Sequence, residues 1–205
     1  MAIDRSDEVQ AALTVAPGDL TAEEALHRHR AFRAAITPLV DVAFRVLRRL
    51  GVRDGEIDDA LQTVLVAADR RFDDLANQQE LKAYVCAACA NVARDIGRSR
   101  ARQFARNAPP EELANAHAGD PTPDDALGRK EALALVQRVL EGMDEERRVV
   151  FVLYELEELT TQQIAEHVGI PAGTVASRLR KARDDFRSAI ARVHAAERGP
   201  SRGAR

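Results

Sequence analysis

The sequence predicts an all-α protein made of two helical domains joined by an extended acidic linker. The composition is 45% hydrophobic and 31% charged but only 4% aromatic, with no Trp, which suits helical cores built from Ala, Leu, Val and Ile. Apolar residues recur at intervals of three and four along 54–72 and 79–102, as expected of amphipathic helices. A length of 205 residues accommodates two such modules.

The bulk charge excludes nucleic-acid binding by a general basic surface. The net charge is -3 and the pI is near 6.0, so any contact with DNA has to come from local basic patches. No run approaches the roughly 18 apolar residues of a membrane span, and the polar N-terminus lacks a signal-peptide core. We therefore expect a cytoplasmic protein that does not insert into membranes.

Composition shifts along the chain predict the domain boundaries. Thr21 followed by Glu24 is a plausible helix start, whereas the preceding residues show little periodicity. Five prolines and glycines and five acidic residues lie between Asn107 and Asp125, which indicates an extended linker. The predicted parts are a flexible tail (1–21), a first domain (22–106), the linker (107–126), a second domain (127–195) and a second tail (196–205).

The first domain begins with helical patterns over 22–35 and 38–50. Thr37 and Pro38 suit the first positions of a helix and Gly51 suits its end, so the pattern predicts two helices, or one kinked at Pro38. A third helix over 54–72 carries an apolar stripe and an opposite polar face that includes Asp58, Asp59, Gln62, Thr63 and Arg70. A fourth over 79–102 carries a polar stripe of Tyr84, Asn91, Asp95, Arg98 and Arg102.

The second domain contains the pattern that points to DNA. After a helix from about Ala126 and another capped by Asp144, Thr160 and Gln163 form a capping box, and Gly169 ends a short helix. Pro171 then starts a second short helix that buries Val175, Leu179, Ala182 and Phe186, and leaves Thr174, Ser177, Arg178, Lys181 and Arg183 outward or flanking.

Two short helices around a glycine turn match the helix-turn-helix, whose second helix enters the major groove. The alternative is an ordinary helical hairpin with a solvated basic face. The spacing of Ala165, Gly169 and Val175 favours the helix-turn-helix. In that motif Arg reads guanine edges, while hydroxyls and Lys hold phosphates.

The sequence offers no candidate for catalysis, and we expect no enzyme activity, metal or cofactor. There is no nucleophile–base pair, P-loop or metal motif in the chain. Cys86 and Cys89 lie in an Ala-rich helical pattern without a second ligand pair, so small buried thiols are favoured over a metal or redox site. His27 and His29 flank Arg28 on a polar face and are read as solvated side chains.

Specific strings resemble a known family. The run 147–183, RRVVFVLYELEELTTQQIAEHVGIPAGTVASRLRKAR, resembles region 4 of the extracytoplasmic-function (ECF) sigma factors of bacterial RNA polymerase. The strings DDALQTVL (58–65) and NVARDIGRSR (91–100) are similar to the polymerase-binding motif and the promoter-reading helix of region 2. One departure is Lys82-Ala83-Tyr84-Val85, where the family commonly carries a Trp-Leu pair.

The resemblance implies a factor that binds core polymerase and directs promoter-specific initiation, with an anti-sigma factor as a further partner. It implies contact with the clamp helices of the largest subunit through Asp58, Asp59, Gln62 and Thr63, and of region 4 with the flap of the second-largest subunit. It assigns the −10 element to Asn91, Asp95, Arg98, Arg100 and Arg102, and the −35 element to Thr174, Ser177, Arg178, Arg180 and Lys181. The alternative is a sigma-like decoy that sequesters a regulatory protein without binding DNA.

Overall fold

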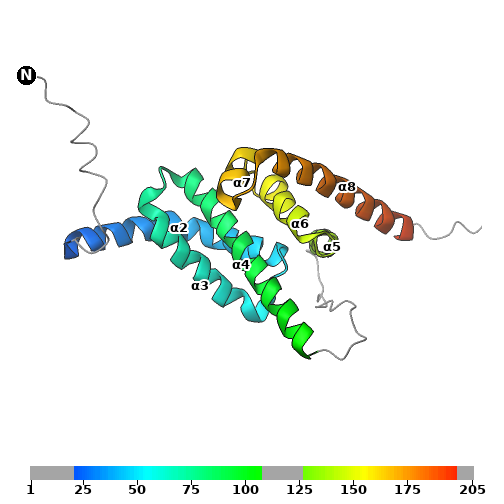
Figure 1. The fold of residues 1–205 in the computed structure, drawn as a ribbon, viewed down its shortest axis with the longest axis horizontal. Coiled ribbons are helices and arrows are strands. Elements are labelled where there is room, and N and C mark those ends of the chain that lie inside the picture. Colours follow the sequence, from blue (N-terminus) through cyan, green and yellow to red (C-terminus); the bar gives the residue numbers. More distant parts are fainter. Residues whose placement is uncertain (1–20, 108–126, 198–205) are drawn as a thin grey trace, which may run out of the picture. The chain divides into compact units, whose positions relative to one another are not determined.

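The structure, a computed structural model, describes residues 21–107 and 127–197 and is all-α over that part of the chain, as predicted (Figure 1). The predicted tails, in residues 1–20 and 198–205, and the linker residues 108–126 lie outside the described residues. The elements in order are α2 (Ala22–Arg49), α3 (Asp54–Arg71), a 3-10 turn (Phe72–Asp74), α4 (Gln78–Asn107), α5 (Leu127–Glu141), α6 (Glu145–Phe151), a π-helical turn (Val152–Leu156), α7 (Thr161–Val168) and α8 (Ala172–Glu197). The described residues fall into two compact units, one ending at Pro38 and one beginning at Leu39.

Residues 22–49 form one helix with Pro38 inside it, so of the two predicted alternatives the chain does not form two helices but a single one. The buried positions Phe32, Ile36, Leu39, Ala43 and Val46 keep spacings of four, three, four and three across the proline. Pro38 has no N–H to donate within the helix, and the Thr37 hydroxyl donates to the Arg33 carbonyl at 2.6 Å instead of capping a new helix. The unbroken apolar stripe outweighs the local start signal.

The end of α2 is confirmed at Gly51, which has a φ of +88°. The Gly51 N–H donates to the Arg48 carbonyl at 3.0 Å, and the Val52 N–H donates to the Leu47 carbonyl at 3.1 Å. These two bonds form a Schellman motif, which requires a left-handed residue at this position. The chain is thereby turned into α3.

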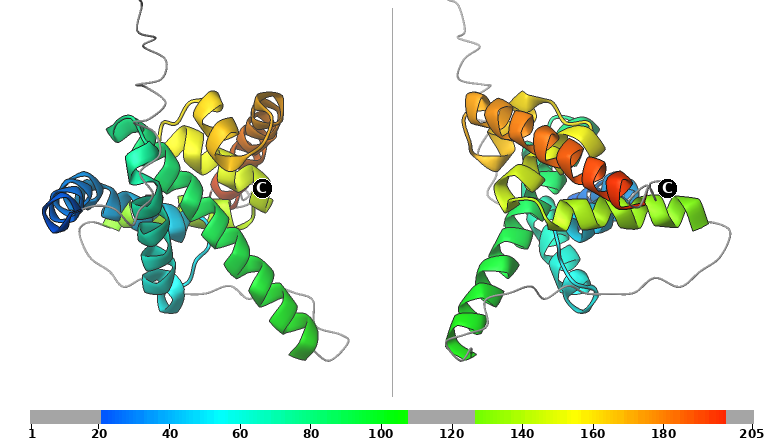
Figure 2. Two further views of the ribbon diagram at one scale, coloured as in Figure 1. Left: turned by 60° about the vertical axis from the view of Figure 1, so that its left-hand side comes forward. Right: turned by 90° about the vertical axis from the view of Figure 1, so that its right-hand side faces the viewer.

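Helices α3 and α4 pack side by side, as Figures 1 and 2 both show. Ile57, Val64 and Ala68 of α3 are buried as predicted, as are Leu81 and Val85 of α4. The helix α4 runs to Asn107, five residues beyond the predicted end at Arg102, and its last turns expose their arginines. Together the two helices have a packed apolar side and an exposed polar side.

Towards the C-terminus the helices are arranged around α8, against which α5, α6 and α7 all pack. Asp144 caps α6 as predicted, because its Oδ1 accepts the Arg147 N–H at 3.2 Å. The prediction that α8 is short is wrong: it has 26 residues, because Ala189, Ile190 and Val193 continue the partly buried stripe beyond Phe186. The rings of Phe151 and Phe186 stack at 4.9 Å and hold α6 against α8.

No helix in the described ranges is long and apolar enough to cross a membrane.

Candidate nucleic-acid and polymerase interfaces

Helices α7 and α8 form the predicted helix-turn-helix. Thr160 caps α7 with a full capping box, in which its hydroxyl accepts the Gln163 N–H at 3.2 Å and its own N–H donates to the Gln163 side chain at 2.9 Å. Gly169 ends α7 with a φ of +75°. Ile164 and Val175 are fully buried, each stabilising the pair by about 1.5–3 kcal/mol. The buried side of α8 thus fixes which residues face outward.

The outward side of α8 carries the predicted promoter-reading residues. Ser177, Arg180 and Lys181 are exposed, while Thr174 and Arg178 are half-buried. Within the described chain neither Arg180 nor Lys181 has an acidic partner, so both cations are available to phosphates. Arg178 is ion-paired with Glu146, and this pairing holds its guanidinium against α6. Arg178 has to exchange Glu146 for a base edge if it reads DNA.

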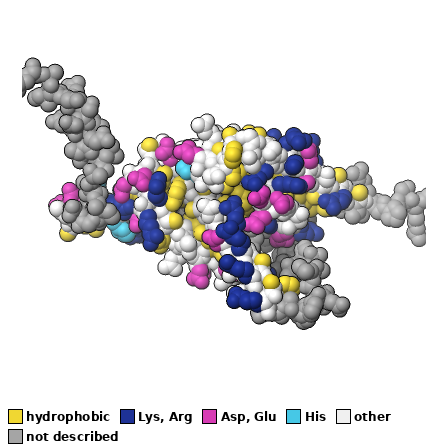
Figure 3. Space-filling view, viewed as in Figure 1, with side chains coloured by type: hydrophobic (Ala, Val, Ile, Leu, Met, Phe, Trp, Pro, Cys, Tyr) yellow, Lys and Arg dark blue, Asp and Glu magenta, His cyan; other side chains and the backbone are white. Residues whose placement is uncertain are grey.

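The predicted polar stripe of α4 is exposed except at Tyr84, which is half-buried and meets the His167 ring edge to face at 6.2 Å. Asn91, Asp95, Arg98 and Arg102 are all exposed, and their spacings of four, three and four place them on one face. Arg98 is ion-paired with Asp95, and the Asn91 side chain accepts from Arg94 at 3.1 Å. Figure 3 shows Lys and Arg side chains gathered along the surface over α4. The stripe combines hydrogen-bonding groups with cations, which suits DNA.

Arg100 differs from the other arginines of this run. Its side chain is half-buried, pairs with Glu56 through two nitrogens and donates to the Gly51 carbonyl at 3.0 Å. Burial lowers the pKa of its guanidinium from the usual value, with Arg53 adding to that effect. Arg100 therefore ties α4 to the turn between α2 and α3, and its donors are occupied.

The predicted polymerase-binding face lies on α3. Asp58, Asp59, Gln62 and Thr63 are all exposed, and the Thr63 hydroxyl donates to the Asp59 carbonyl at 2.8 Å. Val66, which the sequence pattern did not single out, is 45% exposed and lies one turn beyond Gln62 and Thr63. An apolar residue at this spacing falls on a helix face that is otherwise polar, so the sequence alone could have identified Val66. The face therefore offers carboxylates, an amide and one apolar contact.

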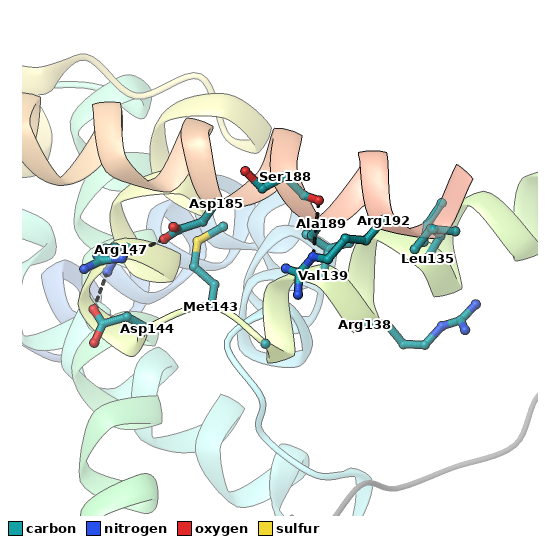
Figure 4. A pocket seen from close by; sticks show the side chains of 12 residues that line it. Leu135, Arg138, Val139, Met143, Asp144, Arg147, Asp185, Ser188, Ala189 and Arg192 are labelled. Carbon is teal, nitrogen blue, oxygen red and sulfur yellow. Dashed lines mark hydrogen bonds and ion pairs between the residues drawn. The ribbon is translucent and has the colours of Figure 1, made fainter. Parts of the chain in front are cut away.

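A hollow of 480 Å³ lies between α5, α6 and α8 (Figure 4). Leu135, Val139 and Met143 contribute apolar walls, and Arg147 is paired with Asp185 across it at 2.8 Å. The Arg192 Nε donates to the Ser188 carbonyl at 3.3 Å on the α8 side. Apolar walls with charged edges suit a short amphipathic segment of another protein.

Cys86 and Cys89 are free, buried thiols, as predicted. Burial raises the pKa of Cys86 to about 12 and that of Cys89 well above its usual value. No group of three or more His, Cys, Asp and Glu side chains in the described ranges is placed to hold a metal ion.

Glu157, which sequence reasoning did not identify, is only 3% exposed. Its Oε1 accepts from Arg49 Nη1 at 2.6 Å, and its backbone carbonyl accepts from Lys82 Nζ at 2.7 Å. Burial raises the pKa of the Glu157 carboxyl, against the opposing effect of Arg49, Arg45 and Lys82. In the string ELEE this residue looks like any solvated acid, so no signal in the sequence distinguishes it.

These features define a helical protein with a helix-turn-helix DNA-binding module. A family model described as Sigma-70, region 4 matches residues 133–185, which include α7 and most of the outward face of α8. The RNA polymerase sigma-E factor of Streptomyces avermitilis is 31% identical over 142 residues, covering 69% of this chain and 75% of that protein. The RNA polymerase sigma factor CnrH of Cupriavidus metallidurans is 29% identical over 169 residues, covering 80% and 88%.

Solved structures of two sigma factors share the fold. RpoE in complex with the anti-sigma factor NepR from Bartonella quintana matches with a TM-score of 0.63 at 18% identity, over 78% of this chain and 97% of that one. CnrH in complex with the cytosolic domain of CnrY matches with a TM-score of 0.56 at 20% identity, over 79% and 88%. The chain belongs to the ECF family of RNA polymerase sigma factors.

Proposed function

We propose that this sigma factor directs initiation through three surfaces. As a member of its family it acts with RNA polymerase and promoter DNA. The α3 face of Asp58, Asp59, Gln62 and Thr63 is the proposed contact with the clamp helices of the largest subunit. The stripe of Asn91, Asp95, Arg98 and Arg102 is proposed for the −10 element, and Thr174, Ser177, Arg178, Arg180 and Lys181 for the −35 element.

The observation that carries the proposal is the outward side of α8. Its cations that have no acidic partner among the described residues, and its hydroxyls, lie on the second helix of a helix-turn-helix, inside the segment that matches region 4. A decoy that had given up DNA would not need this face. The proposed domains are 22–106 for region 2 and 127–195 for region 4, with 107–126 as the linker.

The hollow between α5, α6 and α8 is the proposed seat of the polymerase flap. Its walls of Leu135, Val139 and Met143 suit an apolar helix or loop, and the surrounding arginines suit acidic neighbours. All catalysis is proposed to belong to the polymerase, since the relatives of this chain are sigma factors and not enzymes. The proposed place of action is the cytoplasm, where polymerase and chromosome meet.

The direct test is run-off transcription by purified core polymerase on a promoter library, with and without the protein, followed by sequencing of transcript starts. Starts that depend on the protein and share two spaced upstream motifs are expected. Binding to polymerase without new starts would instead support the decoy.

The clamp contact is tested by Asp59→Ala and Gln62→Ala. Both side chains are exposed, so we expect weaker binding to core polymerase and unchanged helical content by circular dichroism. Asp41→Ala, at an exposed acid of α2, is the matched control and should bind normally. Equal affinities for all three variants by titration would contradict the assignment of this face.

A further inference from the structure

The cations on the outward side of α8 fall into two classes. Arg180 and Lys181 have no acidic partner among the residues that the structure describes. Arg178 and Arg183 border the buried stripe of α8 from opposite sides, and each is ion-paired with an acid of another segment. The acid that holds Arg178 is Glu146 of α6. The two edges of the outward side are therefore neutralised within the protein, whereas its centre is not.

The Arg178–Glu146 pair is the more enclosed on its cationic side. The Arg178 side chain is 23% exposed, compared with 45% for Arg183, while Glu146 is 59% exposed. Water and salt screen a half-buried guanidinium less than one that is fully in solvent. Arg178 is also the side chain that we propose as a reader of bases. The nitrogen that it donates to Glu146 can reach a base edge only after this pair has opened.

The position of Glu146 does not depend on Arg178, because other contacts hold α6 against α8. The rings of Phe151 and Phe186 stack, and Arg147 is paired with Asp185 at 2.8 Å. Glu146 itself lies in the first turn of α6, where the helix dipole favours an acid. The carboxylate therefore stays beside Arg178 whether or not the guanidinium is bound to it.

We propose that Glu146 competes with promoter DNA for Arg178, and that this competition keeps the upstream contact weaker than the outward side of α8 could make it. The inference rests on the proposed function, in which Arg178 contacts the −35 element. Binding exchanges the Glu146 carboxylate for an oxygen or nitrogen of DNA, so the net gain is the difference between two charge-assisted interactions. The carboxylate left behind also repels the phosphates. Glu146 acts through Arg178 and is a positioning residue, and the contact that it weakens is easier to release once transcription has started.

The test is the affinity of holoenzyme for promoter DNA obtained from the run-off selection, measured by fluorescence anisotropy. Glu146→Ala should bind this DNA about two- to fivefold more tightly than the wild type, since partly exposed ion pairs have strengths in this range. Glu145→Ala is the matched control, because it removes the same charge from the neighbouring exposed residue of α6. We expect a smaller effect for this control, and unchanged helical content for both variants.

A double-mutant cycle assigns the gain to Arg178. In an Arg178→Ala background the carboxylate has no guanidinium to hold, so Glu146→Ala should have no more effect than Glu145→Ala. Salt dependence is a second measurement that a purely structural role would not change. Without its competitor Arg178 meets DNA as an additional free cation, so the slope of log affinity against log salt should become steeper by up to about 0.9. Glu146→Gln, which keeps the shape of the side chain, should behave like Glu146→Ala.

The outcomes separate this inference from the proposed function. Unchanged affinity in Arg178→Ala would refute the proposed contact of Arg178 with promoter DNA, and the competition with it. If Arg178→Ala weakens binding but Glu146→Ala and Glu145→Ala bind alike, the proposed function stands and the competition is overturned. A gain for Glu146→Ala that persists in the Arg178→Ala background would also overturn it, because the charge of Glu146 would then act on DNA without Arg178.

Discussion

Arg100 and Arg102 are neighbours in one basic run, yet the structure predicts different effects when each is replaced by alanine. Arg102 is exposed and, within the described chain, has no acidic partner. Affinity for DNA falls as salt rises. If Arg102 contacts one phosphate, its loss should make the slope of log affinity against log salt less steep by about 0.9. Between 50 and 200 mM salt, the loss of affinity would then be about 3.5-fold smaller than for the wild type.

Arg100 donates to Glu56 and to the Gly51 carbonyl, so its donors stabilise the fold. Because the pair is partly exposed, we expect Arg100→Ala to lower the free energy of unfolding by about 1 kcal/mol. The Arg100→Ala change should have a negligible effect on the salt dependence of DNA affinity. Holoenzyme binding to promoter DNA by fluorescence anisotropy at several salt concentrations, together with urea denaturation, measures both quantities. If Arg100→Ala makes the salt dependence of DNA affinity as much less steep as Arg102→Ala does, the assignment of Arg100 to the fold is refuted.

Three further predictions follow from individual side chains. Arg178→Ala should weaken holoenzyme binding to the upstream element by about 1–3 kcal/mol in footprint titrations, and unchanged affinity would remove Arg178 from the interface. Glu158→Gly should raise the free energy of unfolding by up to about 1 kcal/mol in urea, because it relieves a φ of +60°; a decrease would contradict this. The folded pKa values of Cys86 and Cys89 are raised above 9.0, so unfolded thiols release protons first, and stability should fall as pH rises beyond 9.0. The double alanine variant should lose part of that pH dependence.

Much of the fold was predictable because strong local signals agree with the packing. The capping box of Thr160 and Gln163 and the left-handed glycines at 51 and 169 all appear where the sequence places them. Each is a short-range device whose chemistry depends on a few neighbouring residues. Pro38 left one helix or two as alternatives because a local start signal competed with a longer apolar stripe, and the stripe prevailed. The length of α8 was underestimated for the same reason.

The candidate site was predictable as a set of faces and less so as a set of free side chains. Periodicity correctly placed the α3 face and, apart from the half-buried Tyr84, the α4 stripe on the surface. It did not distinguish Arg100, which folds back onto Glu56, from Arg98 and Arg102, because that pairing joins residues 44 positions apart. Nor did it distinguish Arg178, which is held by Glu146 of α6, from Arg180, which has no acidic partner in the described ranges. Contacts between distant segments depend on tertiary geometry that spacing does not contain.

Glu157 shows why a single irregular turn has large consequences for which distant residues meet. In a regular helix each residue adds about 100° to the direction of its side chain, so one π-helical turn changes the phase of everything that follows. Here that change brings the Glu157 carboxylate to Arg49 and the Glu157 backbone carbonyl to Lys82. Because a buried ion pair adds little net stability but penalises any arrangement that leaves one charge unpaired, it selects one geometry over others.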